Sequence, residues 1–270
     1  ITIPAALAML SCTREENPAE TTGDEIVLKV GSEMDFSVDT KATAITAVPS
    51  TMYWGASTGS GTETVKWATS SATVSNGKIS TGKYQTANAT SYNYYAANQD
   101  FTVAGNMTVE NNGIDVIAGR LASSQSTTPT LTLDHIFART GTLTCNTQSE
   151  YTISNISWKI TGKSDINGTA GTYNMKSQKW TAASIKLSTA TTIADSSDMY
   201  LIPGTYTITV SYTLTRGDWS SSFTKSGDVT LTGGKKNNIT CTAIGGSASE
   251  IVLSITLTDW SDQTVSLTLS

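Results

Sequence analysis

Apolar and polar residues alternate with a period of two over much of the chain from Asp24 onward. In the clearest segment, 205–216, every second residue is apolar and the residues between are mainly Thr or Ser. Successive side chains of a strand point to opposite faces, so this pattern predicts a half-buried antiparallel strand. The same alternation occurs in four further sets: Ile26, Leu28 and Val30; Met34, Phe36 and Val38; Ile251, Leu253, Ile255 and Leu257; Val265, Leu267 and Leu269.

Turn signals separate these segments, and no long helical pattern lies between them. Asn-Gly occurs at 76–77, 112–113 and 167–168, Pro-Gly at 203–204 and Gly-Gly at 233–234. Many short strands with frequent turns predict an all-β protein built from sandwiches. A polar stretch without periodicity, 122–129, is the best linker. We therefore expect two tandem β-sandwich domains, 24–128 and 129–270.

The charge balance argues against nucleic-acid binding. The chain has 17 Lys plus Arg against 22 Asp plus Glu, a net charge of −5, and a single adjacent basic pair, Lys235-Lys236, in a turn. The one histidine, His135, lies between two alternating segments and is expected to be a structural residue near the domain junction. No motif for a catalytic site, a metal site or a cofactor is present, so we expect a protein that is not an enzyme.

The N-terminal segment, 1–23, resembles an export signal followed by a tether. Residues 1–10 are apolar and too short to span a bilayer, which fits the apolar region of a secretory signal. The sequence Met-Leu-Ser-Cys that ends at Cys12 resembles a relaxed bacterial lipobox, in which the cysteine is acylated; a buried strand is the alternative. Residues 13–23 are charged and lack periodicity, as in a flexible tether. An acylated Cys12 would anchor the protein to a lipid membrane.

Two other residue types leave alternatives open. Cys145 and Cys241 lie in Thr-rich alternating segments, where they either form a disulfide or are buried as small apolar residues. Tryptophans within strand patterns are expected in the core, and those in polar surroundings are expected to be exposed. The first group is Trp54 and Trp158, and the second is Trp180 and Trp219. Exposed, coplanar tryptophans would form a glycan platform, and a surface glycan-binding lipoprotein is the alternative function.

Several segments together resemble a known family. They are the lipobox at Cys12, residues 25–42, Tyr94-Tyr95-Ala96-Ala97, Leu131 to Arg139, Leu201 to Tyr206, and Leu257-Thr258-Asp259-Trp260. In this order they resemble the fimbrillins, the lipoprotein precursors that build the type V pili of gut and oral anaerobes. The resemblance implies two transthyretin-like sandwiches, a location at the outer membrane and cell surface, and a role in adhesion.

The resemblance also implies a maturation step. In fimbrillins a trypsin-like protease removes the first strand by cutting after a basic residue in the following loop. The corresponding strand here is 25–38, with Ile26, Leu28, Val30, Met34, Phe36 and Val38 on one face, and Lys41 looks like the cut site. Lys29 lies inside the strand, where a protease has poor access, and cutting at Arg14 would release only the lipid.

The partners implied are other pilin subunits, the maturation protease, and a ligand on a host or bacterial surface. The C-terminal segment, with Val265, Leu267 and Leu269, looks like a strand donated to a neighbouring subunit; the last strand of the second sandwich is the alternative. A stalk subunit donates and accepts, a tip subunit only accepts, and an anchor subunit keeps its first strand and lipid. The basic site and the alternating C-terminus favour stalk over tip, and both over anchor.

Overall fold

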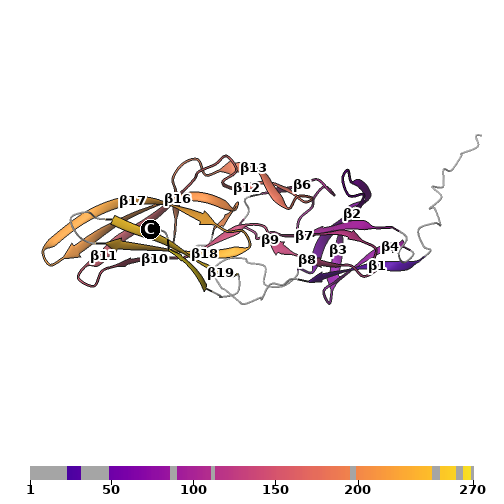
Figure 1. The fold of residues 1–270 in the computed structure, drawn as a ribbon, viewed down its shortest axis with the longest axis horizontal. Helices are drawn as coiled ribbons and strands as arrows, with labels where there is room; N and C mark the ends of the chain where they lie inside the picture. Colours follow the sequence, from indigo (N-terminus) through magenta and orange to yellow (C-terminus); the bar gives the residue numbers. More distant parts are fainter. Residues whose placement is uncertain are drawn as a thin grey trace, which may run out of the picture.

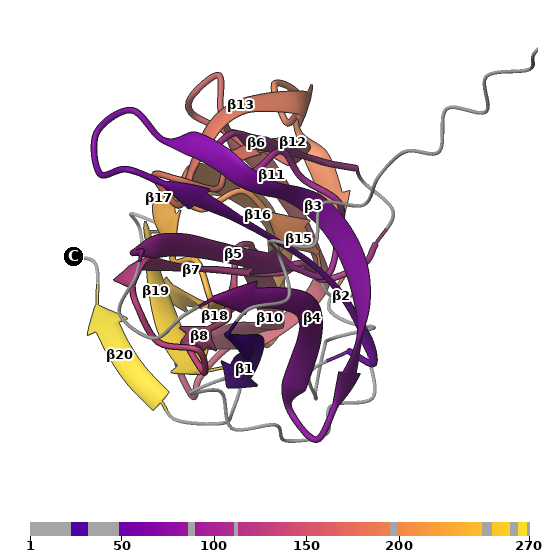
Figure 2. The ribbon, with the colours of Figure 1, turned by 90° about the vertical axis from the view of Figure 1, so that its right-hand side faces the viewer.

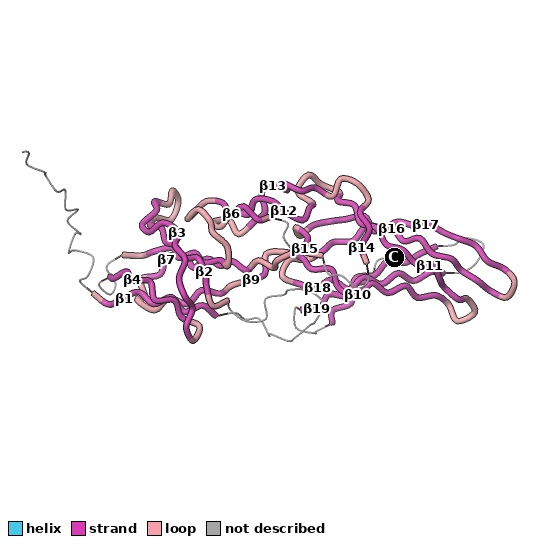
Figure 3. Tube along the Cα trace, turned by 180° about the vertical axis from the view of Figure 1, so that it is seen from behind, coloured by secondary structure: helices cyan, strands magenta, loops and turns pink. Residues whose placement is uncertain are grey.

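The computed structural model describes residues 23–31, 49–85, 90–110, 113–194, 199–244, 250–259 and 264–268, with the backbone alone from 244 onward. Within these ranges the structure consists of strands, turns and loops without a helix (Figure 3). The predicted all-β class is confirmed. The molecule is elongated, with the N-terminal strands at one end and a long sandwich at the other (Figure 1).

An eight-stranded sheet contains the N-terminal strands. In spatial order its members are β8 (Thr130–Thr132), β1 (Asp24–Gly31), β4 (Lys78–Gln85), β3 (Thr64–Ser75), β2 (Thr51–Thr58), β5 (Tyr92–Ala97), β7 (Ile117–Ser124) and β9 (Asp134–His135). The β3–β4 connection is the predicted two-residue Asn76-Gly77 turn. Both residues have positive φ, 50° and 68°, as a hairpin turn that matches the twist of the strands requires.

The two ends of this strand order are adjacent in sequence. β8 pairs with β1, and β9 pairs with β7, yet only Leu133 separates β8 from β9. β7 also passes close to β8, because a Cβ added to Gly119 would lie 2.1 Å from the carbonyl oxygen of Thr132. Residues 130–135 therefore close the sheet on itself around a core that contains Trp54 and Leu131.

Two further sheets form the sandwich at the other end of the molecule. The five-stranded sheet has the order β15 (Tyr200–Leu201), β10 (Ala138–Thr147), β18 (Lys235–Ile244), β19 (Glu250–Asp259) and β20 (Thr264–Thr268). The four-stranded sheet has the order β14 (Thr191–Ile193), β11 (Thr152–Gly162), β16 (Gly204–Arg216) and β17 (Trp219–Leu231). The two sheets share one core, to which β16 contributes the predicted inward row Tyr206, Ile208, Val210, Tyr212 and Leu214.

A three-stranded sheet joins the two halves. Its order is β13 (Lys179–Lys186), β12 (Gly168–Asn174) and β6 (Asn106–Val109), so a strand from before residue 128 pairs with one from after it. A third core beneath it combines residues of both halves, including Phe101, Met107, Phe137 and Tyr173. Residues 130–135, which the predicted division assigns to the second domain, hydrogen-bond within the first sheet. The division into 24–128 and 129–270 stays a prediction.

Candidate functional site

The first described strand, β1, is inserted between two strands that follow it much later in the sequence. β1 runs antiparallel to β4 on one side and parallel to β8 on the other (Figure 2). Its alternating apolar residues Ile26, Leu28 and Val30 are all buried, with 0%, 0% and 4% of their surface exposed. Leu28 lies opposite Ile79 of β4, and Val30 lies opposite Leu131 of β8. β1 therefore covers the core of this sheet with every second side chain.

Backbone hydrogen bonds hold β1 along both edges. The N–H of Val27 donates to the carbonyl of Thr127 at 2.9 Å, and the N–H of Lys29 donates to that of Pro129 at 2.8 Å. On the opposite edge, β1 pairs with β4 across a bulge between Glu25 and Val27. Without β1, these groups of both neighbours would lose their partners, and unpaired strand edges readily accept another strand.

Polar side chains of β4 fix the register of β1. The Glu25 carboxylate accepts hydrogen bonds from the Ser80 hydroxyl and from the N–H of Gly82, the second at 3.1 Å. The Ser80 bond, followed by the Gly82 bond, holds the pKa of Glu25 below its ordinary value. The Thr81 hydroxyl donates to the carbonyl of Ile26 at 2.5 Å. These bonds add to the apolar fit and favour one alignment of the two strands.

The two strands beside β1, β4 and β8, are also connected to other strands of the sheet. β8 continues through Leu133 into β9, where His135 pairs with Ile117 of β7. Leu131 and Leu133 are both fully buried. On the other side, β4 is joined to β3 by the Asn76-Gly77 hairpin. β1 thus fills a slot between β4 and β8, and each of these two strands is also connected to the rest of the sheet, β4 through β3 and β8 through β9.

Comparison with known proteins identifies the architecture. No protein-family model matches the sequence, and no curated protein matches it. Among solved structures, a fimbrillin from Porphyromonas gingivalis W83 matches at 10% identity with a TM-score of 0.52, covering 87% of this chain and 97% of its own. The chain shares its fold with a fimbrillin. A candidate cell adhesion protein from Parabacteroides distasonis, also at 10% identity, has a TM-score of 0.56 and covers 88% and 97% of the two chains.

The structure describes some of the residues of the predicted site. Ile26, Leu28 and Val30 lie in β1 as one buried row. Met34, Phe36, Val38 and the predicted cut site Lys41 lie outside the described residues, as does the predicted lipidation site Cys12. The roles of all these residues in maturation stay predictions.

The candidate donor segment lies at the edge of the fimbrillin-like sandwich. Among the described strands, β20 pairs with β19 alone, with Val265 opposite Leu257 and Leu267 opposite Ile255. Figure 2 shows β20 at the outer side of the molecule. Leu269 lies outside the described residues. An edge strand with one neighbour can leave without breaking any other pairing in its sheet.

His135 lies in the junction as a structural residue. Its Nδ1 is 2.5 Å from the Asp115 carboxylate, and both side chains are buried. Within the described ranges, no group of three or more His, Cys, Asp or Glu side chains is arranged to hold a metal ion. Those same ranges contain no helix of the length and apolarity needed to cross a membrane.

Trp180 and Trp219 do not form a shared platform. Trp54 and Trp158 are in the cores, as predicted, with 2% and 5% exposure. Trp180 was expected to be exposed, but it is half-buried, its Nε1 donates to the carbonyl of Ile136 at 2.9 Å, and it packs in the junction. Trp219 is 48% exposed, at the start of β17. The two residues proposed for glycan stacking thus lie in different parts of the fold.

Two features were missed by sequence reasoning. The first is the pairing of β8 with β1, because a strand of three residues is too short to show a period of two. The second is a buried carboxylate, Glu63, which accepts hydrogen bonds from Ser57, Tyr95 and Arg120, the last at 3.0 Å. Lys176, from the turn between β12 and β13, lies 3.6 Å from the same carboxylate. Ion pairs of Glu63 with Arg120 and Lys176 therefore connect the two halves of the molecule. In the sequence Glu63 is a single acidic residue in a polar loop, and no pattern predicts these partners.

Proposed function

We propose that this protein is a structural subunit of a cell-surface fimbria, and that it polymerises when a strand of another subunit replaces β1. The observation that carries the proposal is the position of β1 between β4 and β8, with Ile26, Leu28 and Val30 buried in the core. The shared fold with a fimbrillin supports a role in a fimbria and in adhesion. Both the protein's surface location and its pilin partners follow from that role.

Loss of β1 would create a strong acceptor. Each of its three buried side chains contributes about 1.5–3 kcal/mol through burial, so an empty slot would expose a costly apolar surface. The edges of β4 and β8 would also carry unpaired backbone groups. An incoming strand that alternates apolar and polar residues satisfies both requirements at once.

The C-terminal segment has the required pattern. Val265, Leu267 and Leu269 have the same two-residue spacing as the buried row of β1. β20 is an edge strand with β19 as its neighbour, so its transfer to a second copy leaves the rest of the sandwich intact. A subunit that accepts at β1 and donates β20 is a stalk subunit; a tip subunit would only accept.

Maturation supplies the trigger in this proposal. The precursor is anchored through an acylated Cys12 at the outer membrane, and a trypsin-like protease cuts after Lys41. The cut separates β1 from the chain that follows, so β1 is held only by non-covalent contacts and an incoming strand can displace it.

Limited digestion with a low dose of trypsin tests the proposal, on protein that starts at Asp24 so that the tether with Arg14 is absent. The wild type is compared with Lys41→Gln, with Lys29→Gln as the control inside β1, and with a variant that lacks residues 264–270. Intact mass locates the cut, and unheated SDS gels reveal multimers. We expect one cut after Lys41 in the wild type and in Lys29→Gln, followed by SDS-resistant multimers.

The variants separate the steps of the mechanism. Lys41→Gln should resist the cut, and the variant without 264–270 should be cut but should stay monomeric. A cleaved wild-type protein that remains a monomer would overturn polymerisation and favour a tip or glycan-binding role. The absence of a cut after Lys41 would overturn the processing site.

A further inference from the structure

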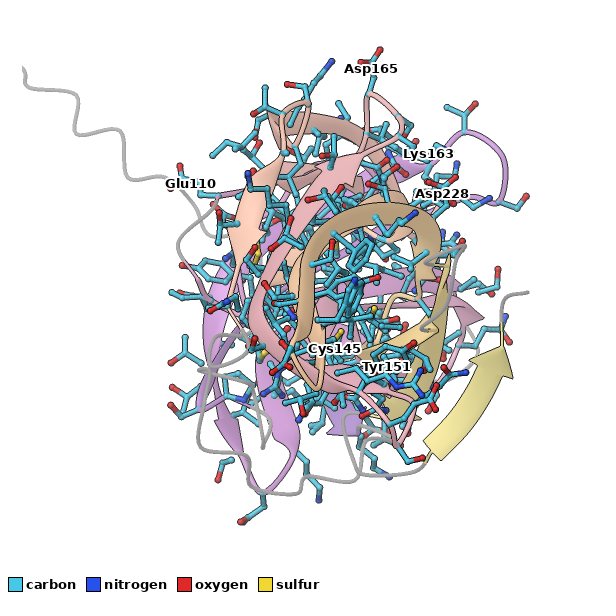
Figure 4. The ribbon with its side chains drawn as sticks, turned by 90° about the vertical axis from the view of Figure 1, so that its left-hand side faces the viewer. Glu110, Cys145, Tyr151, Lys163, Asp165 and Asp228 are labelled. Carbon is cyan, nitrogen blue, oxygen red and sulfur yellow. The ribbon has the colours of Figure 1, made fainter. Side chains whose placement is uncertain are left out.

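The two cysteines of the sandwich lie directly opposite each other on neighbouring strands. β10 and β18 run parallel, and their register pairs Cys145 with Cys241. The pairing is regular on both sides of the cysteines, with Thr144 opposite Thr240 and Asn146 opposite Thr242. Figure 4 looks along the molecule from this end and labels Cys145. Residues far apart in the sequence are thus brought to neighbouring positions of one sheet.

The spacing of the strands suits a covalent bond. Neighbouring strands of a sheet lie about 4.8 Å apart, within the Cα separation of roughly 4.4–6.8 Å that disulfides span. Residues opposite each other point to the same face, and both cysteines pack against the sandwich core. The pKa shifts of the two thiols are those of a hydrogen-bonded pair, which agrees with the register in placing the two sulfur atoms close together.

The thiols differ in access and in acidity. Cys145 is half-buried, whereas Cys241 is completely buried. The hydrogen bond from Cys241 lowers the pKa of Cys145, and the same bond together with burial raises the pKa of Cys241. The thiolate is the attacking form in thiol–disulfide exchange. Cys145 is therefore the thiol that reacts first with a small disulfide from solvent.

We propose that Cys145 and Cys241 form a disulfide that joins β10 to β18 in an oxidising compartment. The Cys145 thiolate attacks a small disulfide, RSSR, forms a mixed disulfide and releases one thiol, RSH. The Cys241 sulfur, after losing its proton, attacks the Cys145 sulfur and releases the second RSH. The two protein thiols are oxidised, one RSSR is reduced to two RSH, and no other reactant is needed.

The bond would define which strands can leave the sandwich. β18 would be fixed to β10, whereas β19 and β20 lie beyond it in the sheet. The next step rests on the proposed function. If β20 is donated to a neighbouring subunit, a pulling force on it would pass from β18 through the disulfide to β10. Residues 146–240 would lie inside the covalent loop and outside that path, so tension on a fimbria would not unravel them.

Thiol mapping in a Cys12→Ser protein tests the proposal, since this change removes the third thiol. The protein is incubated with oxidised glutathione, denatured, treated with N-ethylmaleimide and analysed by intact mass and peptide mapping, with Cys145→Ser as the control. We expect a monomer in which neither thiol is alkylated and in which the two cysteine peptides are linked. Oxidation should raise the unfolding temperature by roughly 5–10 °C, and reduction with dithiothreitol should restore the original value. The unfolding temperature of Cys145→Ser should not rise.

Other products would overturn the proposal. These are alkylation of both thiols, a stable glutathione adduct on Cys145 alone, and a disulfide between two molecules. The linked peptides are sought in protein that has the native thiol pair, so the result does not depend on how well Cys145→Ser folds. The measurement also requires no protease and no polymer, so its failure is distinct from failure of the fimbrial role.

Discussion

Replacing Leu28 with Ala tests whether β1 is an integral part of the first core. Leu28 is fully buried at the centre of the row Ile26, Leu28 and Val30, opposite Ile79. The substitution keeps the backbone pairing of β1 and removes most of one apolar side chain. The matched control is Lys29→Ala, because Lys29 is the next residue in the same strand and its side chain is exposed.

The expected loss follows from burial. A Leu→Ala change at a closed site costs 2–5 kcal/mol, the sum of the lost transfer free energy and the cavity left behind. Complete burial and support from β4 and β8 leave little room for collapse, so we expect a loss of about 3 kcal/mol in the free energy of unfolding. Lys29→Ala should change it by less than about 0.5 kcal/mol, as for most surface substitutions.

Urea unfolding followed by tryptophan fluorescence measures both changes. Trp54 and Trp67 belong to the core cluster that contains Leu28, so their emission reports on this part of the fold. If two transitions appear, the one that involves these tryptophans should shift to lower urea for Leu28→Ala. Equal stabilities of Leu28→Ala and Lys29→Ala would refute the conclusion that β1 fills a slot in the core, and with it the basis for strand replacement.

Three further predictions concern other parts of the structure. Gly119→Ala should destabilise the protein by more than about 1 kcal/mol, because its methyl group would meet a β8 carbonyl at 2.1 Å, whereas Gly61→Ala has open space and should be neutral in urea unfolding. Tyr206→Phe should cost about 1–2 kcal/mol in the same assay, because it removes a buried 2.6 Å hydrogen bond to a backbone carbonyl; exposed Tyr84→Phe is the control. Burial raises the pKa of Glu63, but hydrogen bonds and Arg contacts outweigh it and lower the pKa overall. Its stabilisation should therefore be present above the unfolded pKa of about 4.3 and fade as the pH falls further. Unfolding temperatures of wild type and Glu63→Gln should accordingly converge in acid, and parallel curves would contradict this.

Contacts between distant segments explain why the candidate site was only partly predictable from the sequence. The row Ile26, Leu28 and Val30 follows from the period of two in a single segment. The position of its neighbour β8 does not follow from the sequence, because three residues are too few to show a pattern that would predict parallel pairing with a distant strand. Trp180 is a similar case. Its sequence neighbours are polar, but a hydrogen bond to Ile136 and a ring contact with Phe137 hold it in the junction.

The sequence by itself determined the all-β class, the inward row of β16 and the Asn76-Gly77 turn. These depend on the direction of successive side chains and on local backbone angles, which the residues of one segment specify. The tertiary structure alone decided that β1 lies between β4 and β8, that Glu63 meets Lys176, and that Cys145 lies opposite Cys241. Those are pairings between distant segments, selected by the combined burial of many side chains, so no single segment contains the information that fixes them.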